Sequence, residues 1–402
     1  MIAGFDIKTI DDELIANKKV LVRVDFNVSL SPEGAITDDT RITQAIPTIK
    51  KLLENKNKLI LVSHLGRPKG FDPKYSLQPV RDCLQKIFAD YSVMLVTDFQ
   101  SYEGKKQIEN QKENEIILLE NIRFFKGEKK NDEQFAKQLA TLADIYVDDA
   151  FGSVHRAHAS VAGVPQFIPG FAGLLLKEEI EMLSKIVNNP DHPVVAILAG
   201  AKISTKIGLI SALMKTSDYI IVGGGIANTF LKAKGYKVGV SLVEEESIET
   251  ASQMLTQFEN SSCKLILPVD AICGNLQDSS IAIETNDVSS IPHNMSMLDI
   301  GPQSEKLFDE IIKKGKTIVW NGPVGMFENP LYRHGTDAVY NSVVSQSGAT
   351  TIAGGGDTLA AIADKTENDK ITHISTGGGA MLEFIEKGTL PGIEALSMKH
   401  ES

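Results

Sequence analysis

Short apolar runs rich in β-branched residues alternate with helical patterns along almost the whole chain. Eleven such runs occupy residues 19–27, 58–64, 92–97, 115–121, 144–149, 192–200, 218–224, 263–270, 316–322, 349–355 and 372–378. Between most of them lie helical patterns, at residues 39–55, 132–142, 202–215, 303–314 and 357–365. Near-continuous apolar strands separated by helices are typical of parallel sheets covered on both faces. The chain is therefore predicted to be an α/β protein.

The chain length and the number of strands predict two domains. The 402 residues exceed one domain of about 150 residues, and the predicted strands are many for one open sheet. We expect two doubly wound, Rossmann-like parallel-sheet domains, residues 1–172 and 173–387, joined by a helix that acts as a hinge. The joining helix is predicted at residues 174–187, directly after the Pro- and Gly-containing segment 164–173.

Charge and cysteine content argue against several classes of protein. The net charge of −11 disfavours a general nucleic-acid binder, whose affinity comes from neutralising phosphates. The three cysteines, Cys83, Cys263 and Cys273, form neither an even set nor a CxxC pair, which fits a reducing compartment. The acidic first thirteen residues do not resemble a signal peptide, and no apolar stretch reaches the ~20 residues of a membrane span. We expect a cytoplasmic protein that binds neither nucleic acid nor membranes.

Arginine is concentrated where the strands of the first half end. Only seven of the 41 basic residues are Arg, and six of these lie within the first 156 residues. Four of them, Arg23, Arg67, Arg123 and Arg156, stand at or just after predicted strand ends. Ligands of open parallel sheets bind at the carboxyl ends of the strands, and Arg binds phosphate or carboxylate bidentately. Ordinary surface arginines are the alternative, but clustering at one sheet edge favours a site for a small anion.

Glycine triads follow three strands of the second half, at residues 223–225, 354–356 and 377–379. A single triad is equally consistent with a simple tight turn between strand and helix. Three of them together favour phosphate cradles built from backbone N–H groups. Lys202 and Lys206 are predicted to lie on one face near the start of a helix, where a bound anion would relieve their repulsion. A Walker A loop is absent, and no GxGxxG follows the first strand. These absences disfavour a P-loop NTPase and a dinucleotide dehydrogenase.

Metal binding has one candidate ligand of interest. Asp357 closes the second triad, where it can cap a helix, hold Mg²⁺ on a nucleotide, or do both. His155 and His158 lack a third ligand nearby in the sequence, which disfavours a metal site there.

Nine segments of the chain resemble the phosphoglycerate kinase family. They are VLVRVDFNV (20–28), SHLGRP (63–68), LLENIRF (118–124), DDAFGSVHRAHAS (148–160), AGAKISTKI (199–207), DIGP (299–302), TIVWNGPVGMFE (317–328), AGGGDT (353–358) and HISTGGGAMLE (373–383). The resemblance covers essentially the whole chain, in order. It implies a glycolytic kinase that reversibly transfers a phosphoryl group from 1,3-bisphosphoglycerate to ADP with Mg²⁺. It also implies a monomer whose tail, residues 388–402, returns to the first domain.

The resemblance assigns roles to individual residues. The first domain is expected to bind the phosphorylated glycerate through Asp25, Phe26, Asn27, Arg41, His64, Leu65, Gly66, Arg67, Arg123 and Arg156. The second is expected to bind the nucleotide through Lys202, Lys206, Gly224, Glu328, Gly354, Gly355, Gly356, Asp357 and Thr358. Arg41, Lys202 and Gly378 are the expected catalytic groups, Asp357 is the expected Mg²⁺ ligand, and domain closure is expected to complete the site.

Three positions depart from the family pattern. Ser29 and Met381 stand where the family commonly has Pro and Ser, and Ala199 replaces a frequent Gly. None of these changes removes a charged ligand. The alternatives are another kinase of the same architecture that uses a different acyl phosphate, and a catalytically silent binding protein. Retention of Arg41, Lys202, Lys206 and Asp357 together disfavours the silent protein.

Overall fold

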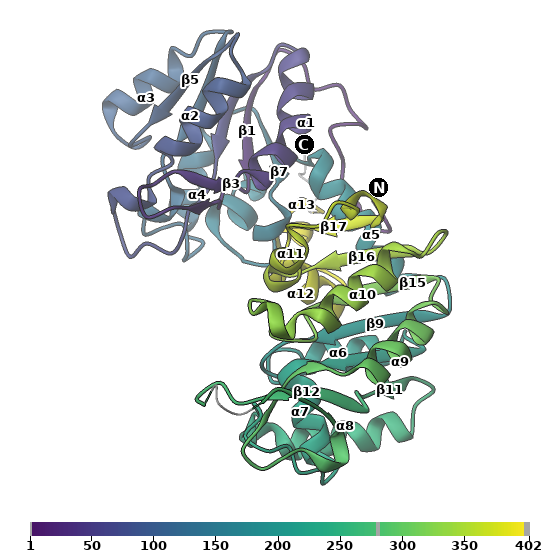
Figure 1. The fold of residues 1–402 in the computed structure, drawn as a ribbon. Helices are drawn as coiled ribbons and strands as arrows, with labels where there is room; N and C mark the ends of the chain where they lie inside the picture. Colours follow the sequence, from purple (N-terminus) through teal and green to yellow (C-terminus); the bar gives the residue numbers. More distant parts are fainter. Residues whose placement is uncertain (1, 279–281, 398–402) are drawn as a thin grey trace. The chain divides into compact units, whose positions relative to one another are not determined.

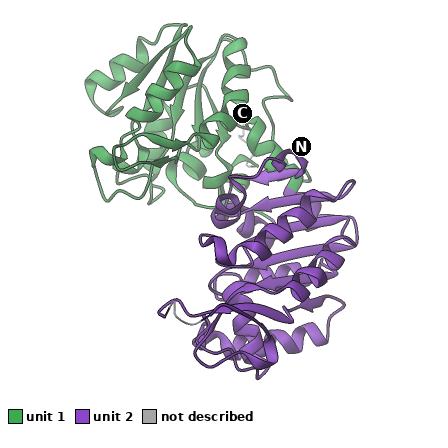
Figure 2. Ribbon diagram, viewed as in Figure 1, with its two compact units in different colours: residues 1–182, 389–402 green, residues 183–388 purple. Residues whose placement is uncertain are grey.

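The computed structural model describes residues 2–278 and 282–397, and the chain divides into two compact units. Unit 1 comprises Met1–Met182 and Thr389–Ser402, and unit 2 comprises Leu183–Gly388 (Figure 2). The division falls inside helix α5 (Leu174–Asn188), which is the helix predicted to join the two domains. Each unit contains its own six-stranded parallel sheet, so the prediction of two doubly wound parallel-sheet domains is confirmed.

The sheet of unit 1 has the strand order β5-β6-β4-β1-β7-β8, and Figure 1 labels its strands β5, β1 and β7. Its strands are β1 (Lys19–Val24), β4 (Lys58–Val62), β5 (Ser92–Val96), β6 (Glu115–Leu119), β7 (Ile145–Asp149) and β8 (Gly170–Ala172). The central strand β1 pairs with β4 on one side and β7 on the other, with Val22 opposite Leu61 and Val147. All three side chains are fully buried in a core that Phe26, immediately after β1, also joins.

Helices and short turns connect the strands of unit 1. The α-helices are α1 (Thr40–Glu54), α2 (Gln78–Ile87), α3 (Tyr102–Glu109), α4 (Glu133–Ala140) and α13 (Pro391–Leu396). The short helices are η1 (Pro73–Tyr75), η2 (Ile122–Phe124), η3 (Phe151–Ser153), η4 (Ala159–Gly163) and η5 (Val164–Gln166), and β2 (Ser29–Leu30) pairs with β3 (Ile36–Asp38). Helix α13 brings the tail back onto η4 and β8, and Gly392 N donates to O of Val154, the residue after η3, at 2.9 Å.

The sheet of unit 2 has the order β11-β10-β9-β15-β16-β17. Its strands are β9 (Val194–Ala199), β10 (Tyr219–Gly223), β11 (Lys264–Ile266), β15 (Thr317–Asn321), β16 (Thr350–Gly354) and β17 (His373–Ser375). Fully buried Trp320 lies in register with Ile197 and Ala353 at the centre of the core. The winding direction reverses between β9 and β15, and ligands of doubly wound sheets bind at such a reversal.

The α-helices of unit 2 are α6 (Ile207–Leu213), α7 (Gly224–Ala233), α8 (Ile248–Glu259), α9 (Pro302–Ile312), α10 (His334–Val344), α11 (Gly356–Ile362) and α12 (Gly379–Lys387). Its short helices are η6 (Glu245–Ser247), η7 (Val288–Ser290), η8 (Pro330–Tyr332) and η9 (Asn368–Lys370). A second, antiparallel sheet of β12 (Asp270–Gly274), β13 (Glu284–Asp287) and β14 (Ser296–Ile300) covers a small core of its own.

Each of the eleven predicted strands corresponds to a strand of the two parallel sheets. The twelfth, β8, escaped prediction because only three residues, Gly170–Ala172, pair at the sheet edge. The antiparallel sheet was also missed. The predicted helix at 202–215 is wrong at its start, since α6 begins only at Ile207.

Candidate functional site

The segments that follow β1 and β4 are tied together through Asp25 and Asn27. Arg41 Nη1 donates to Asp25 Oδ2 at 2.6 Å, and Asn27 N donates to Asp25 Oδ1 at 3.2 Å. Gly66 N donates to Asn27 Oδ1 at 2.8 Å. Four of the predicted substrate residues are therefore brought together at the carboxyl edge of the first sheet.

Two other predicted substrate residues, Phe26 and Leu65, turn their side chains into the core. Phe26 N donates to Ser63 Oγ at 2.8 Å. Any contact that these two residues make with a ligand must therefore come from the backbone.

His64 lies in this edge as a neutral imidazole. Burial lowers its pKa well below 6.5, and the positive charges of Arg23, Arg123 and Arg41 lower the pKa further. Arg23 Nη2 lies 3.1 Å from His64 Nδ1. Because a guanidinium can only donate, Nδ1 is the acceptor and the ring proton is on Nε2. His64 can therefore offer an N–H donor to a ligand but no charge.

Arg23 is a structural residue, which corrects its inclusion among the anion-binding arginines. It points from within β1 into the protein, and it is 1% exposed. Its Nε donates to Ser160 Oγ at 3.0 Å, and Ser160 Oγ donates to the buried carboxylate of Glu128 at 2.7 Å. Arg23 therefore contributes positive potential to the edge without reaching a ligand.

Arg123 supplies the most crowded charge of the edge. Its Nη1 donates to Gly66 O at 2.6 Å. Burial lowers its pKa from 12.5 to about 10, and repulsion from Arg23 and Arg156 adds to the shift, with Glu128 and Asp25 opposing it. Positive charge that is crowded and only partly compensated is what a bound phosphate relieves.

Lys129 is a further cation that the sequence reasoning missed. Its pKa is lowered by burial and by the charges of Arg123, Arg156 and Arg67, so the four cations lie close together. Its Nζ donates to Pro68 O at 3.0 Å. The exposed side chain of Arg67 and the partly exposed side chain of Arg156 complete the group. Lys129 could not be singled out from the sequence, because Lys is common throughout the chain and only the rare Arg residues indicated a binding site.

In unit 2, Lys206 lies at the winding reversal between β9 and β15. Its Nζ donates to Ala199 O at 2.6 Å, to Asn321 O at 3.1 Å and to Asn321 Oδ1. Burial lowers the pKa of Lys206 from 10.5 to about 8, although Asp357 opposes the shift. Its three acceptors are neutral oxygens, which do not cancel the charge of the ammonium. The carboxyl ends of β9 and β15 therefore have a positive charge beside them.

The sequence predicted that Lys202 and Lys206 share one face of a helix. This prediction is wrong, because both residues precede α6. Lys206 is the residue before α6, and Lys202 lies four residues earlier, ahead of the turn at residues 204–206, with an exposed side chain. The pKa of nearby Glu244 is lowered, chiefly by hydrogen bonds from Ser204 and to a smaller degree by Lys202. Lys202 is therefore more exposed than Lys206, which is partly buried.

The glycine triads stand between strands and helices, as predicted, but they differ in use. Gly224 N already donates to Val324 O at 3.1 Å. The triad at residues 223–225 therefore packs against the backbone of Val324. Gly354 and Gly355 join β16 to α11, and Gly377 and Gly378 join β17 to α12. The first N–H groups of a helix have no partners within it, which leaves these two turns suited to anions.

Thr358 and Asn321 hold the turn between β16 and α11 in place. Thr358 Oγ1 donates to Gly354 O at 2.9 Å and accepts from Gly322 N at 2.7 Å. Asn321 Nδ2 donates to Gly354 O at 2.6 Å. Gly355 has φ +101°, and a Cβ there would lie 2.3 Å from Asn321 Nδ2, so this position requires glycine. Asn321, which was not among the predicted site residues, binds both Lys206 and this turn.

Asp357 is not the N-cap of α11, because Gly355 occupies that position. Its carboxylate is exposed in the first turn of the helix, and predicted Glu328 is exposed in the segment after β15. Within residues 2–278 and 282–397, no three His, Cys, Asp or Glu side chains gather where they could hold a metal ion. A metal at Asp357 would therefore find at most two side-chain ligands of these four kinds among the described residues.

Of the three departures from the family pattern, Met381 has the clearest structural consequence. Its side chain is fully buried behind the Gly354 turn, where a Cβ on Gly354 would lie 2.4 Å from Met381 Sδ. Ala199 supplies a carbonyl to Lys206, and Ser29 begins the small strand β2. All three residues leave the charged groups in place.

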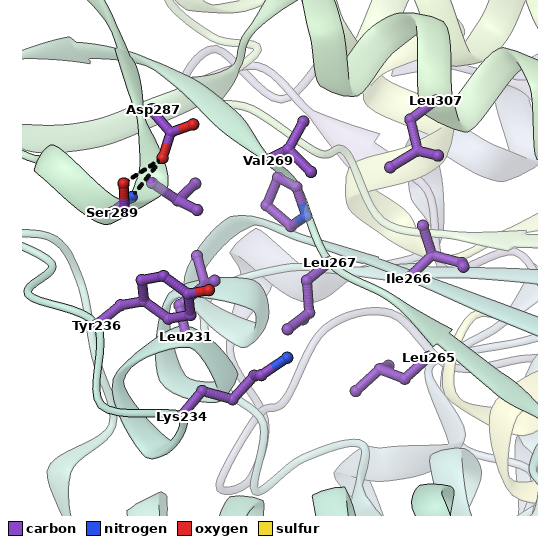
Figure 3. Close-up of a pocket in the computed structure, with 12 residues that line it drawn as sticks. Leu231, Lys234, Tyr236, Leu265, Ile266, Leu267, Val269, Asp287, Ser289 and Leu307 are labelled. Carbon is purple, nitrogen blue, oxygen red and sulfur yellow. Dashed lines mark hydrogen bonds between the residues drawn. The ribbon is translucent and has the colours of Figure 1, made fainter.

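A groove of about 540 Å³ lies elsewhere in unit 2, beside β11 (Figure 3). Leu231, Leu265, Leu267, Val269 and Leu307 are among its apolar residues. Lys234 extends toward these side chains, whereas Asp287 accepts hydrogen bonds from Ser289 (Figure 3). None of the predicted site residues lines this groove.

Among the described helices, none is both long and apolar enough to cross a membrane.

Comparison with known proteins gives the same family throughout. A family model described as phosphoglycerate kinase matches residues 10–388. Phosphoglycerate kinase of Pseudothermotoga lettingae is 47% identical over 97% of this chain and 98% of its own length. Phosphoglycerate kinase of Dictyoglomus turgidum is 47% identical over 96% of this chain and 98% of its own length.

Two solved structures superpose over nearly the whole chain. Phosphoglycerate kinase from Coxiella burnetii has a TM-score of 0.88 at 39% identity, covering 97% of this chain and 98% of its own. The enzyme from Pyrococcus horikoshii OT3 has a TM-score of 0.85 at 30% identity, with the same coverage.

Proposed function

This chain belongs to the phosphoglycerate kinase family, and from that premise we propose that its two sheet edges bind the two reactants of phosphoryl transfer separately. The chain is a phosphotransferase of glycolysis that acts on 3-phosphoglycerate. Unit 1 binds 3-phosphoglycerate or 1,3-bisphosphoglycerate, and unit 2 binds ADP or ATP. The three cysteines are free, which supports action in the reducing cytoplasm, and we propose that the enzyme acts as a monomer.

The crowded positive charge around Arg123 is the observation that carries this assignment. Arg67, Arg123 and Arg156 hold the phosphate that is not transferred, with Lys129 beside them. His64 adds a neutral donor. Asp25 and Asn27 bind the glycerate end, because their carboxylate and amide are held by Arg41 and Gly66 at the same edge. A second fixed anion on the substrate suits this cluster better than an acyl phosphate with only one phosphate.

The nucleotide phosphates are proposed to bind Lys206 and the turns at residues 354–358 and 377–379. Lys206 offers a desolvated ammonium at the reversal of the sheet, where such ligands bind. Gly224 contributes by close approach, since its N–H is engaged, and exposed Glu328 binds the ribose.

Asp357 is proposed to hold Mg²⁺ on the nucleotide. Its single exposed carboxylate fits Mg²⁺, which usually takes one or two carboxylates and completes its shell with phosphate oxygens and water. The bound ion supplies neutralising charge to the phosphates.

The chemistry requires positioning and charge stabilisation. The bond from phosphorus to the carboxyl oxygen of 1,3-bisphosphoglycerate breaks, and a terminal oxygen of ADP forms the new bond. The electron pair leaves with the carboxylate of 3-phosphoglycerate. No base is needed, because the attacking oxygen is already ionised. Arg41, Lys202 and the N–H of Gly378 stabilise charge on the group in transfer.

The proposed function is tested by a coupled assay for ATP consumption that depends on 3-phosphoglycerate and Mg²⁺. We expect rapid turnover by the wild type, and Arg41→Ala should lower kcat by roughly 10²–10³-fold, as the loss of one charge-stabilising donor does elsewhere. Calorimetry should still detect binding of 3-phosphoglycerate to the variant. A folded, nucleotide-binding wild type without turnover would overturn the assignment.

A further inference from the structure

Asn121 lies directly behind the anion-binding edge of unit 1 and ties three of its segments together. It follows β6, and it is completely buried. Its Nδ2 donates to Leu65 O at 2.7 Å and to Tyr75 O at 2.9 Å. Its Oδ1 accepts from Arg123 N at 3.1 Å. All the hydrogen-bonding groups of this side-chain amide therefore engage backbone.

The segments held by Asn121 include those that carry Arg67 and Arg123, two of the four clustered cations proposed to hold the phosphate. Leu65 precedes Gly66, whose carbonyl accepts from the guanidinium of Arg123 at 2.6 Å. Asn121 thus holds the backbone of Arg123 at one end and the strand-end loop that fixes its guanidinium at the other. A displacement of either segment would move the positive charge from its place.

Tyr75 completes the support of this loop. Gly66 has φ +62°, and a Cβ there would lie 2.4 Å from Cε1 of Tyr75, so the loop packs closely against this ring. Because Asn121 binds the carbonyl of Tyr75, it sets the position of the surface against which Gly66 rests.

Glu120 braces Asn121 in turn. Its buried carboxylate accepts from Asn121 N at 2.7 Å, from Leu77 N at 2.8 Å and from Ser76 Oγ at 2.6 Å. The pair of residues after β6 therefore fixes the loop after β4 and residues 75–77 to one strand end.

We propose that Asn121 is a positioning residue for 3-phosphoglycerate binding, acting through Arg123 and Gly66 without contacting the substrate. This inference rests on the proposed function of unit 1. It predicts that loss of the Asn121 amide weakens binding of the glycerate substrate and leaves the nucleotide site unaffected.

The chain offers a closely matched control in Asn57. Asn57 is 2% exposed in the same unit, and its Nδ2 donates to Ile15 O and Leu52 O, both at 2.8 Å. Its Oδ1 accepts from Lys18 N at 3.0 Å. Asn57 immediately precedes β4, at the end of the sheet opposite to the site. The two amides therefore make the same kind of bonds, and only one of them lies behind the anion-binding edge.

The test compares Asn121→Ala with Asn57→Ala in the full chain. We expect both to lower the melting temperature, because each leaves buried backbone groups without partners. Asn121→Ala should raise KM for 3-phosphoglycerate roughly 10- to 100-fold and change KM for ATP less than about twofold. Asn57→Ala should leave both constants within about twofold of the wild type. The milder Asn121→Ser, whose hydroxyl can still accept from Arg123 N, should have a KM for 3-phosphoglycerate between those of the wild type and Asn121→Ala. It replaces Asn121→Ala in the test if that variant does not fold.

Hydrogen exchange of the ligand-free proteins separates failure of this inference from failure of the proposed function. Exchange in residues 63–77 should accelerate in the Asn121 variants and not in Asn57→Ala. Variants of Asn121 with unchanged KM for 3-phosphoglycerate, or with residues 63–77 as protected as in Asn57→Ala, would overturn the inference. A wild type that does not turn over 3-phosphoglycerate would instead contradict the proposed function, while the exchange comparison would still decide whether Asn121 holds the loop.

Discussion

Lys206, at the proposed nucleotide site, holds a buried positive charge that bound phosphates would stabilise. Its ammonium is surrounded by the neutral oxygens of Ala199 and Asn321, and burial lowers its pKa to about 8. Phosphates bound beside it would favour the charged form and raise the pKa again. Binding must therefore take up a proton whenever the free protein has lost it.

We accordingly predict a pH dependence of nucleotide affinity. Below pH about 8 Lys206 is already charged, so affinity should be constant. Above it, affinity for Mg-ADP should fall by up to about tenfold per pH unit, since a pKa unit corresponds to about 1.4 kcal/mol. Calorimetry between pH 7.5 and 9.5, in two buffers of different ionisation enthalpy, should detect the proton uptake. Lys206→Met should bind more weakly and without that uptake, and an unchanged pH profile in this variant would refute the explanation.

At the scale of elements, the turn from β16 to α11 depends on the conformation of Gly355. At its φ of +101° any residue other than glycine is strained, and the nearby Asn321 amide leaves no space for a Cβ. Gly356, the next residue, has open space around its Cα and begins α11. The two glycines therefore form a matched pair for substitution.

Gly355→Ala should destabilise unit 2 by roughly 1–3 kcal/mol, the usual cost of such backbone strain, and should raise KM for ATP because the turn shifts. Gly356→Ala should not destabilise the unit, since Ala is the better helix former. Urea unfolding of both variants measures the difference. Equal stabilities for the two variants would show that the turn is not strained by a side chain at position 355.

The parallel sheets were predictable because their buried strands are long apolar runs with polar or glycine-rich segments after them. The strand β8 and the antiparallel sheet of β12–β14 were not, because their pairing depends on distant segments. Charged residues at strand ends were predictable as a cluster, but Arg23 shows the limit. A residue within a strand faces one side or the other of the sheet, and only the packed structure shows that Arg23 turns toward Ser160 and Glu128.

Helix starts set a similar limit on the nucleotide residues. The spacing of Lys202 and Lys206 suggested a shared helical face, yet the helix begins after both. Asn321 was invisible as a site residue because a single Asn at a strand end carries no pattern. Its importance arises only from the positions of Lys206 and Gly354, which come from other strands.

For the whole molecule, the two proposed binding functions are divided between two units with separate cores. Transfer requires both ligands at once, so a defect in either unit abolishes turnover at low substrate. The two kinds of defect should nevertheless differ in which substrate restores activity.

The most direct test measures KM for both substrates in Arg123→Ala and Lys206→Ala. We predict that Arg123→Ala raises KM for 3-phosphoglycerate at least about tenfold, the effect of losing a charge-assisted contact, with KM for ATP nearly unchanged. Lys206→Ala should do the reverse. Parallel changes in both constants in both variants would contradict the division of the two reactants between the two units.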